Sequence, residues 1–292
     1  MELIDPDPFP DPLPPPPPED PTETDLPRLD YPPLPDKVSV GVVVFSYDGK
    51  INDRLRLWSI DADRALRAVP RVAEVQHAQM VGYGAERVRN KALADALDAG
   101  FDYVVMLDND MWPDFHSREP DQVPFLPAAL EFALDHDGPC LVGAPYCAGG
   151  EDQRVLVSRF VAKKDHMPDG VCNGGVLEAF SRSDAATRRG MELVPCLPTG
   201  CLLVDTRVAR LMAPPWFTYE YRDQRWTEFA STEDTTFTRN LFYLGIPSYV
   251  AWQSWAGHVK ETVVGRPRIY PQEAVPRNVR KAWERAAKKG GG

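Results

Sequence analysis

Residues 103–110 read YVVMLDND, a run of five apolar residues that ends in Asp108, Asn109 and Asp110. An unbroken apolar run of this length is typical of a central strand whose two faces are both covered. The acidic triplet then lies where the strand ends. Because ligands of open α/β sheets bind beyond the carboxyl ends of the strands, the stretch predicts both the type of sheet and the edge that carries its site.

Strands and helices alternate on both sides of this stretch. Short apolar runs predict the strands, and a 3.6-residue apolar period predicts the helices. The expected strands are 38–45, 71–80, 103–107 and 140–145, and the helices between them are 53–68, 85–99 and 125–135. Such alternation implies right-handed crossovers, and therefore an α/β fold with a mostly parallel central sheet flanked by helices.

The alternation breaks after Tyr146. Residues 148–195 contain many glycines and charges and one clear strand, at 155–161, which indicates an insertion over one edge of the sheet. The further elements expected are strands at 202–204 and 247–252 and helices at 206–212, 231–244 and 276–289.

Charge and proline are spread unevenly along the 292 residues. Residues 1–36 hold 14 of the 30 prolines and ten acids against one base, so this segment predicts a disordered tail. The folded domain is expected at 37–265. Residues 266–292 carry eight bases and two acids, which suits phosphate contact but equally fits a solvated basic helix. The net charge of −10 for the whole chain is therefore a poor guide to the partner.

Membrane spanning and secretion are both disfavoured by the sequence. No apolar run approaches the roughly 18–20 residues that a membrane helix needs, and the N-terminus is acidic and proline-rich. The five cysteines form an odd set without C-x-x-C spacing, which favours reduced, packed thiols. We expect a cytoplasmic protein, with no membrane and no obligate protein partner.

Two features point to an anion or a metal at the end of the 103–107 strand. Asp108 and Asp110 can hold a hard cation that keeps positions open for phosphate oxygens, although Asp-Asn-Asp is also a common turn. Arg89 lies in the middle of the apolar stripe of the 85–99 helix. Its guanidinium needs the carboxylates or a phosphate beside them, unless it reaches around the helix end to solvent.

Two further candidates lie near the C-terminal end of the folded domain. Glu233 and Asp234 open a helix, where acids complement the helix dipole; such a carboxylate also suits a general base. His258 follows the last strand and Gly257, and is either a structural histidine or a metal ligand.

Taken in order, these residues resemble the GT-A fold glycosyltransferases, near family 2. The resemblance covers residues 38 to about 262 and rests on the series rather than on any one motif. It is carried by Ser46-Tyr47, Arg89-Asn90, Asp108-Asn109-Asp110 (the DxD motif), Pro198-Thr199-Gly200, Glu233-Asp234 and His258. It implies a Rossmann-like GT-A sheet and transfer of a sugar, with inversion, from a nucleoside-diphosphate sugar such as a UDP-sugar.

The resemblance also implies a role for each matching residue. Asp110 becomes the direct ligand of Mn²⁺ or Mg²⁺, with His258 as a second ligand and Asp108 as a contact to metal or ribose. Asp234 becomes the catalytic base, with Glu233 as the second choice. The donor would be bound by Ser46 and Tyr47 at the nucleobase, Arg89 at the pyrophosphate, and further by Asn90, Asp108, Asn109, Thr199 and Gly200.

Acceptor contacts are expected in the insertion and in an aromatic, basic loop. That loop contributes Tyr219, Tyr221, Arg222, Arg225 and Trp226, which can stack on a sugar or base and contact a phosphodiester, or can form a lid over the donor. The chain is similar to bacteriophage glycosyltransferases, some of which modify hydroxymethylated pyrimidines in DNA. That similarity makes DNA carrying hydroxymethylcytosine the leading acceptor. A glycan, protein or small-molecule acceptor, or a non-catalytic module that binds nucleotide-sugar or glycan, remains open.

Overall fold

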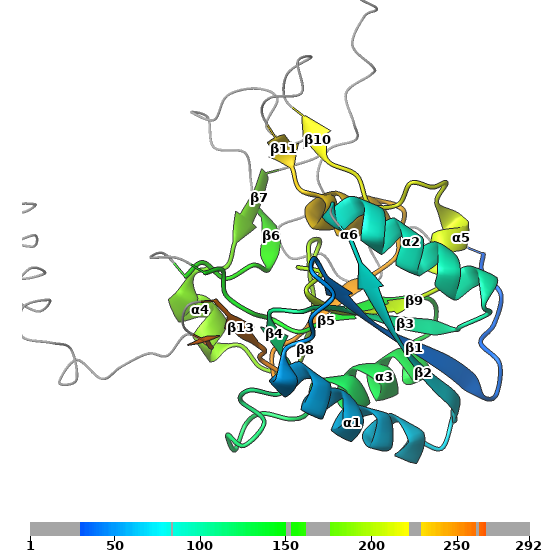
Figure 1. Cartoon of the computed structure of the whole chain (residues 1–292). Coiled ribbons are helices and arrows are strands. Elements are labelled where there is room, and N and C mark those ends of the chain that lie inside the picture. The colour runs from blue at the N-terminus through cyan, green and yellow to red at the C-terminus, as the bar shows by residue number, and fades with distance from the viewer. Residues whose placement is uncertain are drawn as a thin grey trace, which may run out of the picture.

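The computed structural model describes residues 30–82, 84–149, 153–161, 176–221, 229–260 and 263–266. A seven-stranded sheet runs through the molecule (Figure 1). Its strands, in spatial order, are β2 (Val72–Val81), β1 (Val38–Ser46), β3 (Tyr103–Asp108), β9 (Cys201–Asp205), β5 (Leu141–Gly143), β12 (Ser248–Ala251) and β8 (Met191–Leu193).

The sheet is mixed, and its strand directions confirm the expected α/β class. β1 pairs in parallel with β2 and β3, and β12 pairs in parallel with β5. β9 runs antiparallel to both β3 and β5, and β8 runs antiparallel to β12. Five strands therefore point one way, while β9 and β8 oppose them. β8 lies inside the 148–195 segment and β9 follows it, so neither strand is reached through one of the strand-helix-strand units of the N-terminal half, and the crossover rule does not set their direction.

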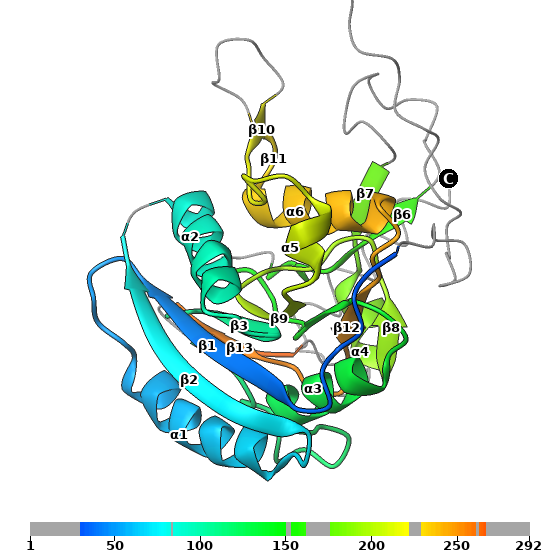
Figure 2. The same ribbon diagram turned by 90° about the vertical axis from the view of Figure 1, so that its right-hand side faces the viewer.

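Helices cover both faces of the sheet (Figure 1). On one face lie α1 (Asp53–Ala68) and α3 (Phe125–Asp135), and Figure 2 shows α1 running beneath β1 and β2. On the other face lie α2 (Ala85–Asp98), α5 (Val208–Leu211) and α6 (Glu233–Tyr243). Gly100 has φ 77° just after α2, as its expected place at the helix end requires.

The apolar runs feed two hydrophobic cores, one on each side of the sheet. Along β3, Val105 and Leu107 pack in the core beneath α1 and α3, whereas Val104 and Met106 pack in the core beneath α2 and α6. The same alternation holds along β1. Successive strand side chains point to opposite faces, so a strand covered on both faces needs apolar residues at every position.

Short elements surround the carboxyl ends of the central strands. They form three small sheets, β4 (Met111–Trp112) with β13 (Gly257–Val259) and β14 (Val263–Val264), β6 (Ser158–Val161) with β7 (Val176–Ala179), and β10 (Glu220–Tyr221) with β11 (Phe229–Ser231). The 148–195 segment was expected to hold one strand. Its described part contains β6, β7, a short helix α4 (Arg182–Thr187) and β8, which adds to the main sheet.

The two ends of the chain lie mostly outside the described residues, including the predicted tail up to residue 29 and the predicted helix at 276–289. Residues 30–36 lie against the fold: Tyr31 donates a hydrogen bond to the carbonyl of Asp137, and Arg207 donates one to the carbonyl of Pro32. Within the described ranges, no helix combines the length and the hydrophobicity needed to cross a bilayer.

Candidate active site

A cavity of about 790 Å³ opens at the carboxyl ends of β1 and β3. We call it the carboxyl-edge cavity. Its size is that of a pocket for a small ligand. The polar residues that line it come from the ends of β1 and β3, from α2 and α6, from β13 and the residue after it, and from the loops after β5 and before β6 and β10. They include Ser46, Tyr47, Arg89, Asp108, Asn109, Asp110, Tyr146, Arg154, Tyr219, Glu233, Asp234, His258 and Lys260.

The pairing of β4 with β13 brings Asp110 and His258 together. His258 lies opposite Met111 in this ladder, and the amide of Val259 donates to the carbonyl of Asp110 at 2.6 Å. The Nε2 atom of His258 is 3.3 Å from Oδ2 of Asp110. Its Nδ1 atom is 2.9 Å from the carbonyl oxygen of Cys147. A carbonyl only accepts, so Nδ1 carries a proton, and Nε2 is the ring nitrogen that faces Asp110 and could bind a metal.

Asp110 also contacts Lys260, whose Nζ lies 2.5 Å from the same Oδ2 atom. Burial alone would raise the pKa of Asp110, but the hydrogen bonds from His258 and Lys260 lower that pKa to about 2. Asp110 is therefore a carboxylate at neutral pH. Lys260 was not among the residues expected from the sequence. The signal was present, because His258 and Lys260 are two residues apart and strand side chains repeat with a period of two.

Arg89 binds two carboxylates at the base of the cavity. Its Nη2 lies 2.8 and 2.9 Å from the two carboxylate oxygens of Asp108, and its Nη1 lies 2.5 Å from Oε1 of Glu233. Only 5% of Arg89 is exposed. Of the partners that the sequence left open, the structure pairs this guanidinium with the carboxylates. The ion-pair cluster ties α2, the end of β3 and the start of α6 together.

Burial has the largest effect on the pKa values of the two acids in this cluster. It raises the pKa of Asp108 and of Glu233, and the attraction of Arg89 only partly offsets that rise. Burial would also lower the pKa of Arg89, but Asp108 and Glu233 raise it above its ordinary value. The guanidinium therefore stays charged and supplies the cation that both acids need.

Asp234 and Glu233 differ in what they contact. Glu233 is held by Arg89 and by a hydrogen bond from Tyr219. Asp234 accepts hydrogen bonds from the amide of Thr235, at 2.8 Å, and from the hydroxyl of Thr232. It forms no ion pair with any residue that the structure describes. The N-cap of α6 is Thr232.

The expected Thr199 and Gly200 lie beneath the cavity rather than in its lining. The Gly200 amide donates to the Tyr146 hydroxyl at 3.0 Å, and the Gly200 carbonyl accepts from the Asp108 amide at 2.9 Å. A Cβ at position 200 would be 2.5 Å from the Tyr146 oxygen, so any other residue there would force Tyr146 to move. Thr199 is 1% exposed. Tyr146, which lines the cavity, was not expected from the sequence.

The other expected donor contacts fall into two groups. Tyr47, at the end of β1, is 63% exposed at the cavity, and Ser46 beside it donates to the carbonyl of Lys50 at 2.7 Å. Asn109 also lines the cavity, and its Oδ1 accepts from the amide of Asn52 at 2.8 Å. Asn90 is instead turned toward the chain at 216–217, where its side chain bonds backbone groups, and it is not part of the cavity lining described.

The expected acceptor residues are only partly described. Tyr219 lines the cavity, and Tyr221 lies in β10. Arg222, Arg225 and Trp226 lie outside the described residues. Arg154, from the 148–195 segment, adds a basic side chain to the lining that the sequence did not predict.

Two of the lining side chains, Asp110 and His258, fit a divalent cation. In the described ranges, no group of three or more His, Cys, Asp or Glu side chains is arranged to hold a metal ion. Asp108 was expected to join Asp110 and His258, but Arg89 binds both of its oxygens. Asp110 and His258 would thus supply two ligands, and the remaining positions around a hard cation would suit phosphate oxygens and water.

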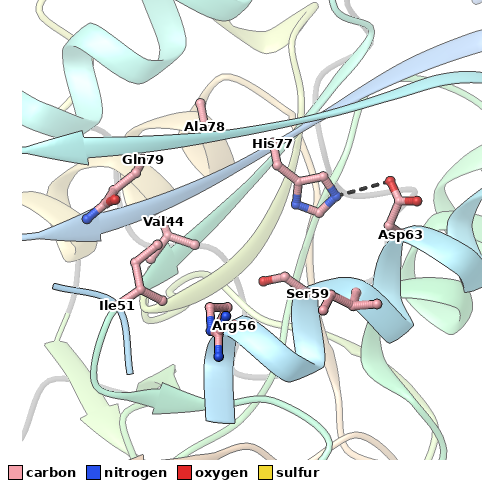
Figure 3. Close-up of a pocket in the computed structure, with 9 residues that line it drawn as sticks. Val44, Ile51, Arg56, Ser59, Asp63, His77, Ala78 and Gln79 are labelled. Carbon is pink, nitrogen blue, oxygen red and sulfur yellow. Dashed lines mark hydrogen bonds and ion pairs between the residues drawn. The ribbon is translucent and has the colours of Figure 1, made fainter. Parts of the chain in front are cut away.

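A second cavity, of about 480 Å³, lies between α1 and β2 (Figure 3). Apolar side chains such as Val44 and Ile51 share its lining with polar ones. Two of the lining side chains, His77 of β2 and Asp63 of α1, are in contact, with Nε2 3.2 Å from Oδ1. Asp110 and Asp234 do not line this cavity. The residues given for its lining include none from the carboxyl-edge cavity, so the two are separate.

Comparisons with known proteins bear on the fold alone. No family model matches the sequence. No curated protein matches it either. The chain is similar in structure to A197 from STIV, with 15% identity, coverage of 80% of this chain and 99% of that chain, and a TM-score of 0.48. HddC from Yersinia pseudotuberculosis aligns with 8% identity over 77% of this chain and 95% of that chain, with a TM-score of 0.31. Similarity at these levels assigns no function to the chain.

Proposed function

We propose that the chain is a metal-dependent glycosyltransferase that moves a sugar from a nucleoside-diphosphate sugar to an acceptor hydroxyl, with inversion at the anomeric carbon. One observation carries the proposal. Asp234, a carboxylate at a helix start, lines the same cavity as the Asp110–His258 pair. A base and a cation-binding pair that share one cavity at the ligand edge of an α/β sheet suit group transfer from a diphosphate.

On the donor side, Asp110 and His258 would hold Mn²⁺ or Mg²⁺. The ion, when bound, would stabilise the negative charge that develops on the departing diphosphate. The basic side chains of Lys260 and Arg154 line the same cavity and add positive potential for phosphate. The exposed ring of Tyr47 offers a stacking surface for the nucleobase. Arg89 acts indirectly, because it holds Asp108 and the start of α6 in place.

On the acceptor side, Asp234 would take the proton of the attacking hydroxyl. The amide of Thr235 and the hydroxyl of Thr232 fix the orientation of its carboxylate. Glu233 suits this role less, since Arg89 and Tyr219 already bind it. A base on the face opposite the leaving diphosphate gives direct displacement, and hence inversion.

The leading acceptor is a 5-hydroxymethyl pyrimidine in DNA. The support is the sequence resemblance to phage enzymes and the aromatic, basic composition of residues 219–226, of which Tyr219 lines the cavity. Glycan, protein and small-molecule acceptors are competing choices. A non-catalytic module that binds nucleotide-sugars is the competing function, and it would bind the donor without turning it over.

One experiment tests the function and the acceptor together. The protein is incubated with a panel of nucleotide-sugars, with Mn²⁺ or with EDTA, and with plain or hydroxymethylcytosine DNA. We expect Mn²⁺-dependent release of nucleoside diphosphate and a DNA mass increase of one glycosyl unit on the modified DNA. Donor binding without release under any condition would favour the binding module. Release without any gain of DNA mass would rule out the DNA acceptor and leave the transferase.

A further inference from the structure

Lys260 occupies the carboxylate oxygen that a bound cation would use. Its Nζ is 2.5 Å from Oδ2 of Asp110, the same atom that faces Nε2 of His258 at 3.3 Å. The aliphatic stem of Lys260 lies close to Gly149, where an added Cβ would be 2.8 Å from Cγ of the lysine. The stem thus packs against bare backbone, and the ammonium group lies at the Asp110–His258 pair.

We propose that Lys260 is a displaceable internal cation, which neutralises Asp110 while the site is free of metal and moves to the donor diphosphate when a divalent ion binds. The inference rests on the proposed function, because it concerns the same Asp110–His258 pair. It goes beyond that function by assigning Lys260 two positions. In the first the lysine lowers the affinity for the metal ion, and in the second it raises the affinity for the diphosphate.

Exposure and chemistry make the ammonium displaceable. The side chains of Lys260 and Asp110 are 46% and 39% exposed, so water competes for both partners and the pair contributes little free energy. A lysine has a flexible four-carbon stem and a point charge that can turn to a new anion at small cost. A divalent ion bound to the same oxygen would repel the ammonium, and the nearest new anion would be the diphosphate.

Arg89 provides the contrast within the same cavity. Its guanidinium is buried and is bonded to both Asp108 and Glu233, so a ligand cannot draw it away without leaving two carboxylates unpaired. Of these two cations, Lys260 is therefore the one that can exchange partners during a reaction cycle.

The test compares Lys260→Met with the wild-type protein in two binding experiments. In the first, Mn²⁺ alone is titrated and free Mn²⁺ is followed by electron paramagnetic resonance. We expect the variant to bind Mn²⁺ about three- to tenfold more tightly, because a competing cation is gone. In the second, inorganic pyrophosphate is titrated calorimetrically in excess Mg²⁺. Here we expect about three- to tenfold weaker binding, because a phosphate contact is gone.

Two controls separate this role from a change in net charge or in packing. Lys91→Met removes a lysine whose side chain is 67% exposed and pairs with Asp95 on α2, and it should leave both affinities unchanged. Lys260→Arg keeps the charge and should keep Mn²⁺ affinity near that of the wild type. Unchanged or weaker Mn²⁺ binding by Lys260→Met would overturn the inference while leaving the proposed function intact. Absence of Mn²⁺ binding in the wild type as well would overturn the proposed metal dependence together with it.

Discussion

Replacing Arg89 with methionine is expected to lower the free energy of unfolding by about 3–5 kcal/mol. Methionine keeps much of the length of the side chain but removes the cation that Asp108 and Glu233 share. Glu233 is 7% exposed, so water cannot replace the lost partner. Removal of one member of a buried ion-pair cluster leaves uncompensated charge, which costs far more than the loss of a surface pair.

Urea denaturation at pH 7 measures this loss. Arg64→Met is the matched control, because Arg64 pairs with Asp61 at 3.2 Å with both side chains about three-quarters exposed. That control should change stability by no more than about 0.5 kcal/mol. Adding Glu233→Gln to Arg89→Met should restore part of the lost free energy of unfolding, because it removes one of the two carboxylates that have lost their cation. Equal effects of Arg89→Met and Arg64→Met would contradict the placement of Arg89.

The loss should also depend on pH with a defined sign. Burial already raises the pKa of Asp108 and Glu233 in the native protein, and removal of Arg89 raises both further. An acid whose pKa is raised by folding favours the native state at low pH, and that contribution disappears as pH rises through the folded pKa. The difference between wild type and Arg89→Met should therefore be largest near pH 8 and smaller near pH 5. A pH-independent difference would show that packing, not charge, is lost.

Replacing Asp234 with asparagine is expected to lower kcat for sugar transfer by about 10²- to 10⁴-fold. Asparagine is nearly isosteric, and its side-chain oxygen can still accept the bonds from Thr232 and Thr235, but it cannot take a proton at neutral pH. Other residues form the proposed donor site. Binding of the donor nucleotide with Mn²⁺ should consequently stay within about twofold of wild type.

Steady-state and single-turnover kinetics separate these two effects, with thermal unfolding as a check on the fold. Loss of kcat with unchanged donor affinity is the signature of a group that acts in the transition state. If Asp234→Asn retained wild-type kcat, Asp234 would not be the base. Arg89 and Tyr219 already bind Glu233, so the role would not pass readily to that residue.

The sequence could predict the core strands because a strand that is buried on both faces consists almost entirely of apolar residues. The runs at 38–45 and 103–107 are apolar at nearly every position, and β1 and β3 bury both of their faces. The direction of β9 could not be predicted in this way. A short buried strand has the same apolar pattern whether its neighbours run parallel or antiparallel, and the hydrogen-bond ladder that decides the direction is made with residues far away.

The sequence could predict where the acidic residues of the candidate site lie in the fold, but not which side chains they contact. Asp108 and Asp110 follow a buried strand, which alone places them at the ligand edge. The partner of Arg89 was open, because Glu233 is 144 residues away and its helix start meets α2 only in the folded chain. Lys260 was missed for a similar reason. Its contact with Asp110 depends on the pairing of β4 with β13, and both strands are too short for a distinct pattern.

The most direct test of the central claim is a crystal structure with Mn²⁺ and a nucleoside diphosphate, in which anomalous scattering locates the metal. We expect one manganese peak in the carboxyl-edge cavity, coordinated by Asp110, by Nε2 of His258 and by oxygens of the diphosphate. The same crystals of Asp110→Ala should lack the peak. A diphosphate bound in the cavity between α1 and β2, or a manganese ion that contacts neither Asp110 nor His258, would contradict the account.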